Sequence, residues 1–144
     1  MQLIDLVIKH EGLRLTVYDD ATGKPIVAGS QCVGNPTLGV GRELSKTGIS
    51  DAEARELLKN DIVRFSKELD KALPWWRKLT ENRQQVIFSM AFNMGIAGLL
   101  GFKNTLKSIQ DGNYEAGATQ MLESKWSKQV GKRAVELAEM MRLG

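Results

Sequence analysis

Residues that bind metals or form disulfides are scarce in this chain. Its 144 residues include one cysteine, Cys32, and one histidine, His10. A single cysteine excludes an intrachain disulfide, and one cysteine with one histidine cannot build a structural zinc site. Long apolar runs are also missing, so the sequence predicts no membrane-spanning segment. We therefore expect a protein that needs no metal or organic cofactor and does not insert stably into a membrane.

A recognisable export signal is missing as well. Residues 1–10 are partly apolar, but Asp5 interrupts the apolar stretch, and the segment has neither a basic leader nor a small-residue cleavage site. We therefore expect no signal peptide. Such a chain would stay in the cytoplasm until another factor releases it.

Charge of one sign is in modest excess and is unevenly distributed. The formal net charge is +3, and residues 73–144 carry ten basic and six acidic side chains. This surplus suits a polyanionic partner such as nucleic acid, anionic lipid or an acidic cell-wall polymer. It equally suits a solubilising surface. The hydrophobic content of 42% is sufficient for a folded core.

The first part of the chain predicts a short helix followed by a small antiparallel sheet. Residues 2–11 place apolar side chains on one helical face, and Gly12 is suited to end that helix. Over residues 13–42, apolar residues alternate with turn sequences, notably at 22–25 and 34–36.

The rest of the chain predicts helices. Ser50-Asp51-Ala52-Glu53 is a capping box, and apolar residues at helical spacing extend the helix to about Ala72, before Pro74. Later glycines separate further helices near 81–94, 103–111, 113–123 and 131–142. The fold class is therefore α+β. We expect one domain with a sheet lobe at about 13–50, a linking helix at about 51–72 and a helical lobe at about 73–144 on which helix 2–11 packs.

Carboxylates are the strongest candidates for catalysis, because no nucleophile elbow, HExxH motif or phosphate-binding loop is present. Glu11 lies in the last turn of the first helix, where the negative end of the helix dipole disfavours its ionised form. A carboxyl group that stays protonated can act as a general acid. Asp19 and Asp20 begin the first turn of the sheet, and a carboxylate there could hold a water molecule. Thr37, on the next strand, could give that water a second hydrogen bond.

Each of these residues also has an ordinary structural interpretation. Glu11 could be a solvated residue at a helix end, and aspartates at the start of a turn commonly cap that turn. The spacing of the three residues does not decide between the two interpretations.

The order of motifs along the chain is more specific. His10-Glu11-Gly12-Leu13-Arg14-Leu15, Tyr18, Asp20 and Thr37-Leu38-Gly39-Val40-Gly41 together resemble the phage T4 lysozyme family, glycoside hydrolase family 24. Later segments resemble that family in the same order, namely Phe92-Asn93-Met94-Gly95, Gly101-Phe102-Lys103-Asn104-Thr105-Leu106, Ser124-Lys125-Trp126 and Arg133-Ala134. The resemblance extends from residue 1 to about residue 140.

The resemblance implies a lysozyme-like α+β fold and an inverting muramidase. Such enzymes hydrolyse the β-1,4 bond between N-acetylmuramic acid and N-acetylglucosamine in peptidoglycan. By similarity, the catalytic residues are Glu11 as acid, Asp20 as the water-positioning carboxylate, and Thr37. Tyr18 fixes the register that selects Asp20, and Arg133 resembles an arginine that pairs with the catalytic glutamate. The implied sugar-binding residues are Phe92, Asn93, Thr105 and Gln120.

The sequence departs from the family pattern at two places. In the family, the threonine follows the aspartate after a few residues, whereas here an insertion of roughly Thr22 to Asn35 intervenes. Ser30 and Cys32 are therefore alternatives to Thr37 for binding water. In addition, Arg42 follows the Gly-x-Gly strand where the family often has histidine.

The resemblance also implies a biological setting. We expect a monomeric endolysin with peptidoglycan as substrate and no nucleic-acid partner, released from the host cytoplasm with a holin and acting on the wall in the periplasm. A lytic transglycosylase is an alternative, in which one acid acts without water and leaves an anhydro sugar. A non-catalytic wall-binding module that uses the basic C-terminal half is another.

Overall fold

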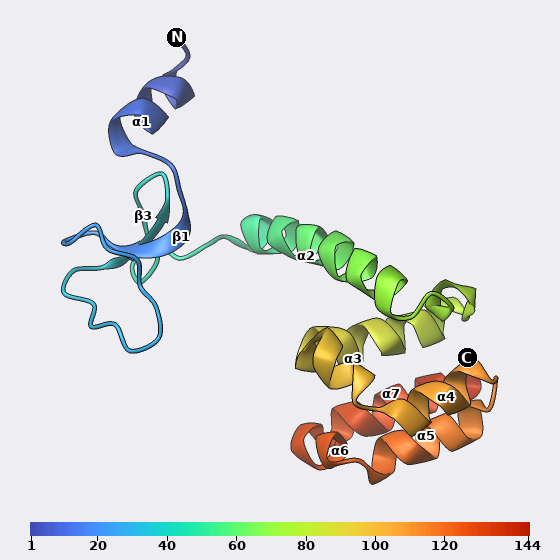
Figure 1. Ribbon diagram of the computed structural model, residues 1–144. Coiled ribbons are helices and arrows are strands. Elements are labelled where there is room, and N and C mark those ends of the chain that lie inside the picture. The colour runs from blue at the N-terminus through green and yellow to red at the C-terminus, as the bar shows by residue number, and fades with distance from the viewer. The chain divides into compact units, whose positions relative to one another are not determined.

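The computed structural model describes residues 1–144, and its internal contacts divide the chain into two units. The sheet unit comprises Met1–Leu57 and the helical unit comprises Leu58–Gly144. The boundary lies within helix α2, Asp51–Ala72, whose bounds agree with the predicted linking helix (Figure 1). The predicted α+β fold class is confirmed.

The sheet unit contains one helix and a three-stranded antiparallel sheet. Its elements are α1 (Leu3–Glu11), β1 (Arg14–Asp19), β2 (Pro36–Gly39) and β3 (Arg42–Glu43), with β2 between the other two strands. Gly12, at φ 78°, ends α1 as predicted, because a left-handed backbone favours glycine. The long connection from β1 to β2 is the insertion seen in the sequence.

Strand register places Thr37 at the centre of this sheet. Thr37 lies opposite Tyr18 on β1 and opposite Glu43 on β3. Within the sheet unit, the two fully buried residues are Asp19 and Thr37, both polar. The interior of the small sheet is therefore organised by hydrogen bonds at the end of β1 and the start of β2.

The start of α2 is capped as the sequence predicts. Glu53 N–H donates to Ser50 Oγ at 3.1 Å, and Ser50 N–H donates to Glu53 Oε2 at 2.8 Å. Arg42 forms an ion pair with Glu53 at 2.8 Å and donates to the Gly48 carbonyl at 3.1 Å. The hydrogen bonds from Ser50, together with Arg42, lower the pKa of Glu53. Arg42 thus fastens the first turn of α2 to the end of the sheet.

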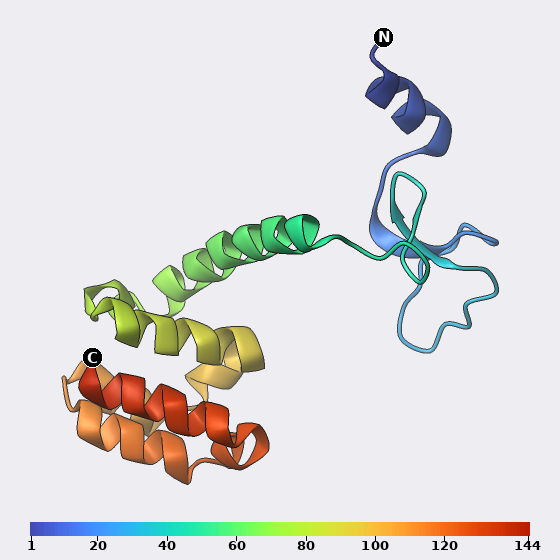
Figure 2. The same ribbon diagram turned by 180° about the vertical axis from the view of Figure 1, so that it is seen from behind.

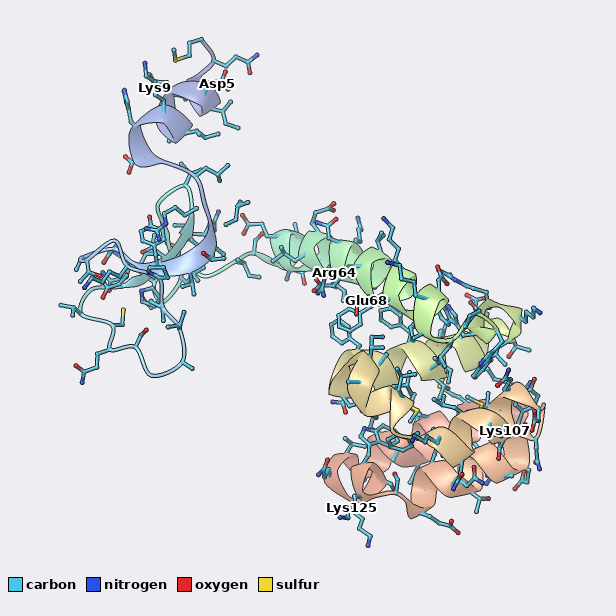
Figure 3. The ribbon with its side chains drawn as sticks, viewed as in Figure 1. Asp5, Lys9, Arg64, Glu68, Lys107 and Lys125 are labelled. Carbon is cyan, nitrogen blue, oxygen red and sulfur yellow. The ribbon has the colours of Figure 1, made fainter.

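The charged residues of α2 form a solvated surface. Arg55 pairs with Asp51 one turn earlier at 2.7 Å. Arg64 Nη1 lies 3.9 Å from Glu68 Oε1, again across one turn (Figure 3). Exposed pairs of this kind contribute little to stability.

The helical unit packs helices around a single apolar core. After α2 come the short 3₁₀ helix η1 (Trp76–Lys78) and helices α3 (Glu81–Leu100), α4 (Lys103–Gln110), α5 (Tyr114–Glu123), α6 (Lys125–Val130) and α7 (Lys132–Leu143). Helices α4, α5 and α7 lie side by side in both ribbon views (Figures 1 and 2). The largest fully buried side chains are Leu69, Val86, Ile87, Met90, Leu99, Ile109, Met121 and Met141.

Two helices of this unit differ from the sequence prediction. The helix predicted to end at Gly95 resumes beyond it and reaches Leu100, although Gly95 itself is non-helical with φ 81°. The break was therefore placed correctly, but the apolar residues after it form another helical turn. Helix α6 was not predicted, because six residues are too few to show a helical period; Ser124 caps it by accepting from Ser127 N–H at 3.1 Å.

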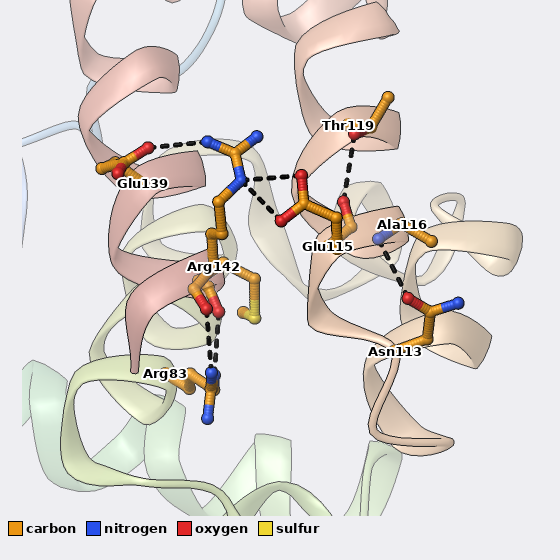
Figure 4. Close-up of polar contacts among 8 residues, drawn as sticks. Arg83, Asn113, Glu115, Ala116, Thr119, Glu139 and Arg142 are labelled. Carbon is orange, nitrogen blue, oxygen red and sulfur yellow. Dashed lines mark hydrogen bonds and ion pairs between the residues drawn. The ribbon is translucent and has the colours of Figure 1, made fainter.

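Arg83 ties the start of α3 to the end of α7. Its Nε donates to the Met141 carbonyl at 2.8 Å, and Nη2 donates to the Arg142 carbonyl at 3.1 Å (Figure 4). The guanidinium carbon also lies 3.5 Å from the centre of the Tyr114 ring. Arg83 thereby satisfies carbonyls at a helix C-terminus that have no partner within the helix.

No single helix is long and apolar enough to cross a membrane. Helices α3 and α4 meet that test only as a pair, which is bent by 105°.

Candidate active site

Glu11 is the last residue of α1, at the negative end of the helix dipole. Its carboxylate lies beside the turn between β2 and β3, and a Cβ atom on Gly41 would be 3.5 Å from Glu11 Oε2. Within the sheet unit, the side chain accepts no hydrogen bond. Both oxygens of Glu11 are therefore free to hydrogen-bond to another group.

Asp20 and Thr37 are brought together by Asn35. Asn35 N–H donates to Asp20 Oδ1 at 2.7 Å, and its side-chain amide donates to Asp20 Oδ2 at 3.3 Å. Thr37 Oγ1 donates to the Asn35 carbonyl at 3.0 Å. The same carbonyl accepts from Asp20 N–H at 3.1 Å. The insertion therefore does not separate Asp20 from Thr37; its last residue connects them.

Asp19 has a different environment from its neighbour. It is only 3% exposed, and its carboxylate accepts hydrogen bonds from the N–H groups of Ala21, Val33 and Gly34 at 2.7–3.0 Å. Desolvation acts to raise the pKa of Asp19, but the backbone hydrogen bonds outweigh it and the pKa is lowered. Asp19 therefore fastens the end of the insertion to the end of β1, and this is a structural task.

The two alternatives to Thr37 are occupied elsewhere. Ser30 Oγ accepts from Val27 N–H at 3.0 Å inside the inserted loop. Cys32 is exposed, and its thiol lies 3.4 Å from the Gly34 carbonyl. Desolvation and the negative charge of Asp19 raise the pKa of Cys32, so the thiolate is disfavoured. Among the three, Thr37 is the residue that shares a hydrogen-bond partner with Asp20.

Tyr18 lies on β1, and its expected role stays a prediction. It pairs with Thr37 across the two strands and with Pro25 in the inserted loop. The guanidinium carbon of Arg14 lies 4.0 Å from the centre of its ring. These contacts fix the register at the end of β1, where Asp19 turns inward and Asp20 remains exposed.

Two of the predicted sugar-binding residues, Thr105 and Gln120, line one cavity of the helical unit. This cavity has a volume of about 730 Å³ and is also lined by Trp126. Asn93 does not line the cavity but contacts a residue that does, since Trp126 Nε1 donates to Asn93 Oδ1 at 2.9 Å. Gln120 Oε1 is buried and has no hydrogen-bond partner in the protein. Gln120 is therefore a polar residue at the cavity with an unsatisfied acceptor, whereas the Trp126 side chain is part of the buried core.

Phe92 lies outside the lining of this cavity. Its ring packs with Phe65 and Phe88, at centroid distances of 5.4 and 6.0 Å. The structure therefore groups Thr105, Gln120 and, indirectly, Asn93, but not Phe92.

Arg133 was expected to pair with Glu11, and its contact within the helical unit is with a serine. Arg133 Nη2 donates to Ser89 Oγ at 3.1 Å within the helical unit, and its pairing with Glu11 stays a prediction.

The sequence indicated no role for Asn35, because the residue lies at the end of an insertion with no counterpart in the family pattern. Its position two residues before Thr37 was the available signal.

Comparison with known proteins identifies the family. A family model described as phage lysozyme matches residues 8–140. The chain is 27% identical over its whole length to the pre-baseplate central spike protein Gp5 of Enterobacteria phage T4, and 29% identical over 90% of its length to an endolysin of Bacillus phage B103. It spans only 28% and 45% of those two proteins. A T4-type lysozyme 2, named as probable, from Dictyostelium discoideum is 23% identical, with 99% of this chain and 94% of that protein covered. The chain therefore belongs to the phage lysozyme family.

Proposed function

We propose that this protein is a muramidase that hydrolyses the β-1,4 glycosidic bond between N-acetylmuramic acid and N-acetylglucosamine in peptidoglycan, with inversion at the anomeric carbon. The observation that carries the proposal is the arrangement of Asp20 and Thr37 around Asn35, in the same unit as Glu11. Family membership and the names of the relatives, which include endolysin and lysozyme, support the same activity.

The proposed reaction assigns one step to each carboxyl group. Glu11 donates its proton to the glycosidic oxygen as the bond from that oxygen to the anomeric carbon breaks. A water molecule held by Asp20 and Thr37 attacks the opposite face of the sugar and forms the new bond. Asp20 accepts the proton that this water loses. Inversion follows because the bond forms on the face opposite the leaving group.

The cavity at Thr105 and Gln120 is the proposed binding place for a sugar of the substrate. Gln120 Oε1 has no hydrogen-bond partner in the protein, and a turn of its side chain toward the cavity would let it accept a hydrogen bond from an N–H or O–H group. N-acetyl sugars present both kinds of group. Binding there would leave the Gln120 oxygen satisfied, which removes a desolvation cost.

The biological role that we propose is that of an endolysin. The protein would act as a monomer, remain in the host cytoplasm until holin-dependent release, and then degrade the wall in the periplasm and lyse the cell. The basic surplus of residues 73–144 would favour approach to an anionic wall.

Mass spectrometry of muropeptides released from purified sacculi tests the proposed reaction. The wild type should release products with a reducing N-acetylmuramic acid end. Glu11→Gln should fold normally and lose roughly 10²- to 10⁴-fold in rate, because the amide cannot donate the proton. Asp5→Asn, on the same helix, is the control and should keep full activity.

The other outcomes distinguish the alternatives. Anhydro products would identify a lytic transglycosylase and overturn the hydrolase assignment. Binding of the wild type to sacculi without any release of muropeptides would identify a wall-binding module.

A further inference from the structure

Asn35 contacts both groups that would position the attacking water. Its N–H and its side-chain amide donate to different oxygens of Asp20, so a single residue binds both oxygens of that carboxylate. The carbonyl of Asn35 accepts from Thr37 Oγ1 and from Asp20 N–H. Four hydrogen bonds therefore join Asn35, the last residue of the insertion, to Asp20 and Thr37 on either side of the insertion.

These bonds determine which way the Thr37 hydroxyl points. A hydroxyl has one proton to donate, and Thr37 donates it to the Asn35 carbonyl. Toward a water molecule, Thr37 Oγ1 is then left only as an acceptor. An ionised Asp20 is also only an acceptor. A water held between them must donate both of its protons to the protein, so its lone pairs are directed away from Thr37 and Asp20.

Gly34 restricts the Asp20 carboxylate from the other side. A Cβ atom at position 34 would collide with Asp20 Oδ1 and with the Cβ of Ala21. The backbone of Gly34 is itself held by the buried carboxylate of Asp19. The Asp20 carboxylate is thus confined between a fixed backbone and the two donors of Asn35.

We infer that Asn35 is a positioning residue for the water-activating step. It fixes the carboxylate of Asp20 and orients the Thr37 hydroxyl as an acceptor, so that the bound water presents a lone pair to the anomeric carbon. This inference rests on the proposed function. It adds a role for the inserted segment, which brings its own residue to the site.

Steady-state kinetics on a soluble peptidoglycan fragment of defined length test the inference. Asn35→Ala removes the side-chain donor and keeps the backbone bonds, so kcat should fall roughly tenfold to a hundredfold with KM unchanged. Asn35→Asp keeps the shape but places a carboxylate against Asp20, so kcat should fall further. If Asn35 had only a structural role, Asn35→Ala should lose more kcat than Asn35→Asp, because aspartate has the shape of asparagine and preserves the packing better. Gln31→Ala, an exposed residue of the same loop, is the control and should keep the wild-type kcat.

A spectroscopic measurement makes the test independent of activity. In the wild type, the side-chain amide resonances of Asn35 should move when Asp20→Asn removes the charged acceptor, whereas those of Asn104 should not. If the resonances move and no variant or wild-type protein releases muropeptides, the proposed function fails and the Asp20–Asn35 contact stands. If the wild type is active and Asn35→Ala and Asn35→Asp keep the wild-type kcat, the positioning role of Asn35 is overturned.

Discussion

Asp19 and Asp20 are adjacent in the sequence, yet their carboxylates face different environments. The carboxylate of Asp19 is buried and accepts three backbone N–H groups, including those of Val33 and Gly34. The carboxylate of Asp20 is exposed and is held by Asn35. Asp19 is the last residue of β1 and its side chain is buried, whereas Asp20 begins the following turn and stays exposed.

This difference predicts opposite effects for two matched substitutions. Asp20→Asn should abolish most activity and leave thermal stability close to that of the wild type, because the exposed carboxylate is the proposed base. Asp19→Asn should lower the melting temperature of the sheet unit, because the new NH₂ group cannot accept the backbone N–H bonds. Activity per folded molecule and thermal unfolding, measured on both variants, check this. Loss of activity only in Asp19→Asn would move the base to Asp19.

Gly34→Ala should reduce activity through Asp20. The added Cβ has no free space, because it would meet Asp20 Oδ1 and the Cβ and N of Ala21. The Asp20 carboxylate or the loop must therefore move, and a displacement of about 1 Å at a catalytic group can cost roughly 10²-fold in rate. A crystal structure and kcat of this variant provide the measurement. Wild-type kcat with an undisplaced Asp20 would contradict the expected confinement.

The sequence predicted the elements whose signals are local. The capping box at Ser50, the break at Gly95 and the stop at Gly12 each depend on neighbouring residues, and each was confirmed. Helix α6 was missed because a short helix has no measurable period.

The candidate site was predicted less completely, because its residues come together through an insertion. We expected an insertion of roughly Thr22 to Asn35 to intervene between Asp20 and Thr37. The structure shows that the end of this loop is bonded to Asp19 and Asp20. Such contacts join positions 14 or 15 residues apart, and no pattern of hydrophobicity or turn residues encodes them.

Arg83→Ala should destabilise the helical unit without altering the catalytic residues. The substitution removes two hydrogen bonds to the carbonyls at the end of α7 and the contact with the Tyr114 ring. Charged hydrogen bonds contribute about 1.5–3 kcal/mol each, so we expect a loss in that range or above. Arg55→Ala removes only an exposed ion pair and should change stability by less than about 1 kcal/mol. Urea unfolding of both variants gives the comparison, and equal effects would contradict it.

Arg133→Ala and Lys128→Ala should separate a local role from the general charge of residues 73–144. If Arg133 acts beside Glu11, its removal should lower kcat at every salt concentration. Lys128→Ala should change only the salt dependence, because long-range attraction weakens as the Debye length falls from about 10 Å at 0.1 M salt to about 3 Å at 1 M. Rates of both variants at the two concentrations decide this. Identical salt responses and no loss of kcat at 1 M would make Arg133 an ordinary surface charge.

Asp19 should make the stability of the inserted loop depend on pH. Its pKa in the folded protein lies below the ordinary value of 3.8, so folding favours the ionised form. The resulting stabilisation is complete above about pH 5, decreases as the pH falls past the ordinary pKa, and is lost as the pH falls through the lowered pKa of Asp19. Protonation removes the charge that the N–H groups of Val33 and Gly34 bind, and these amides should then exchange faster with solvent. Hydrogen exchange at Val33 and Gly34, corrected for intrinsic rates, should show protection that decreases toward acid in the wild type. In Asp19→Asn the protection should be low at every pH, and wild-type protection in that variant would show that the backbone, not Asp19, holds the loop.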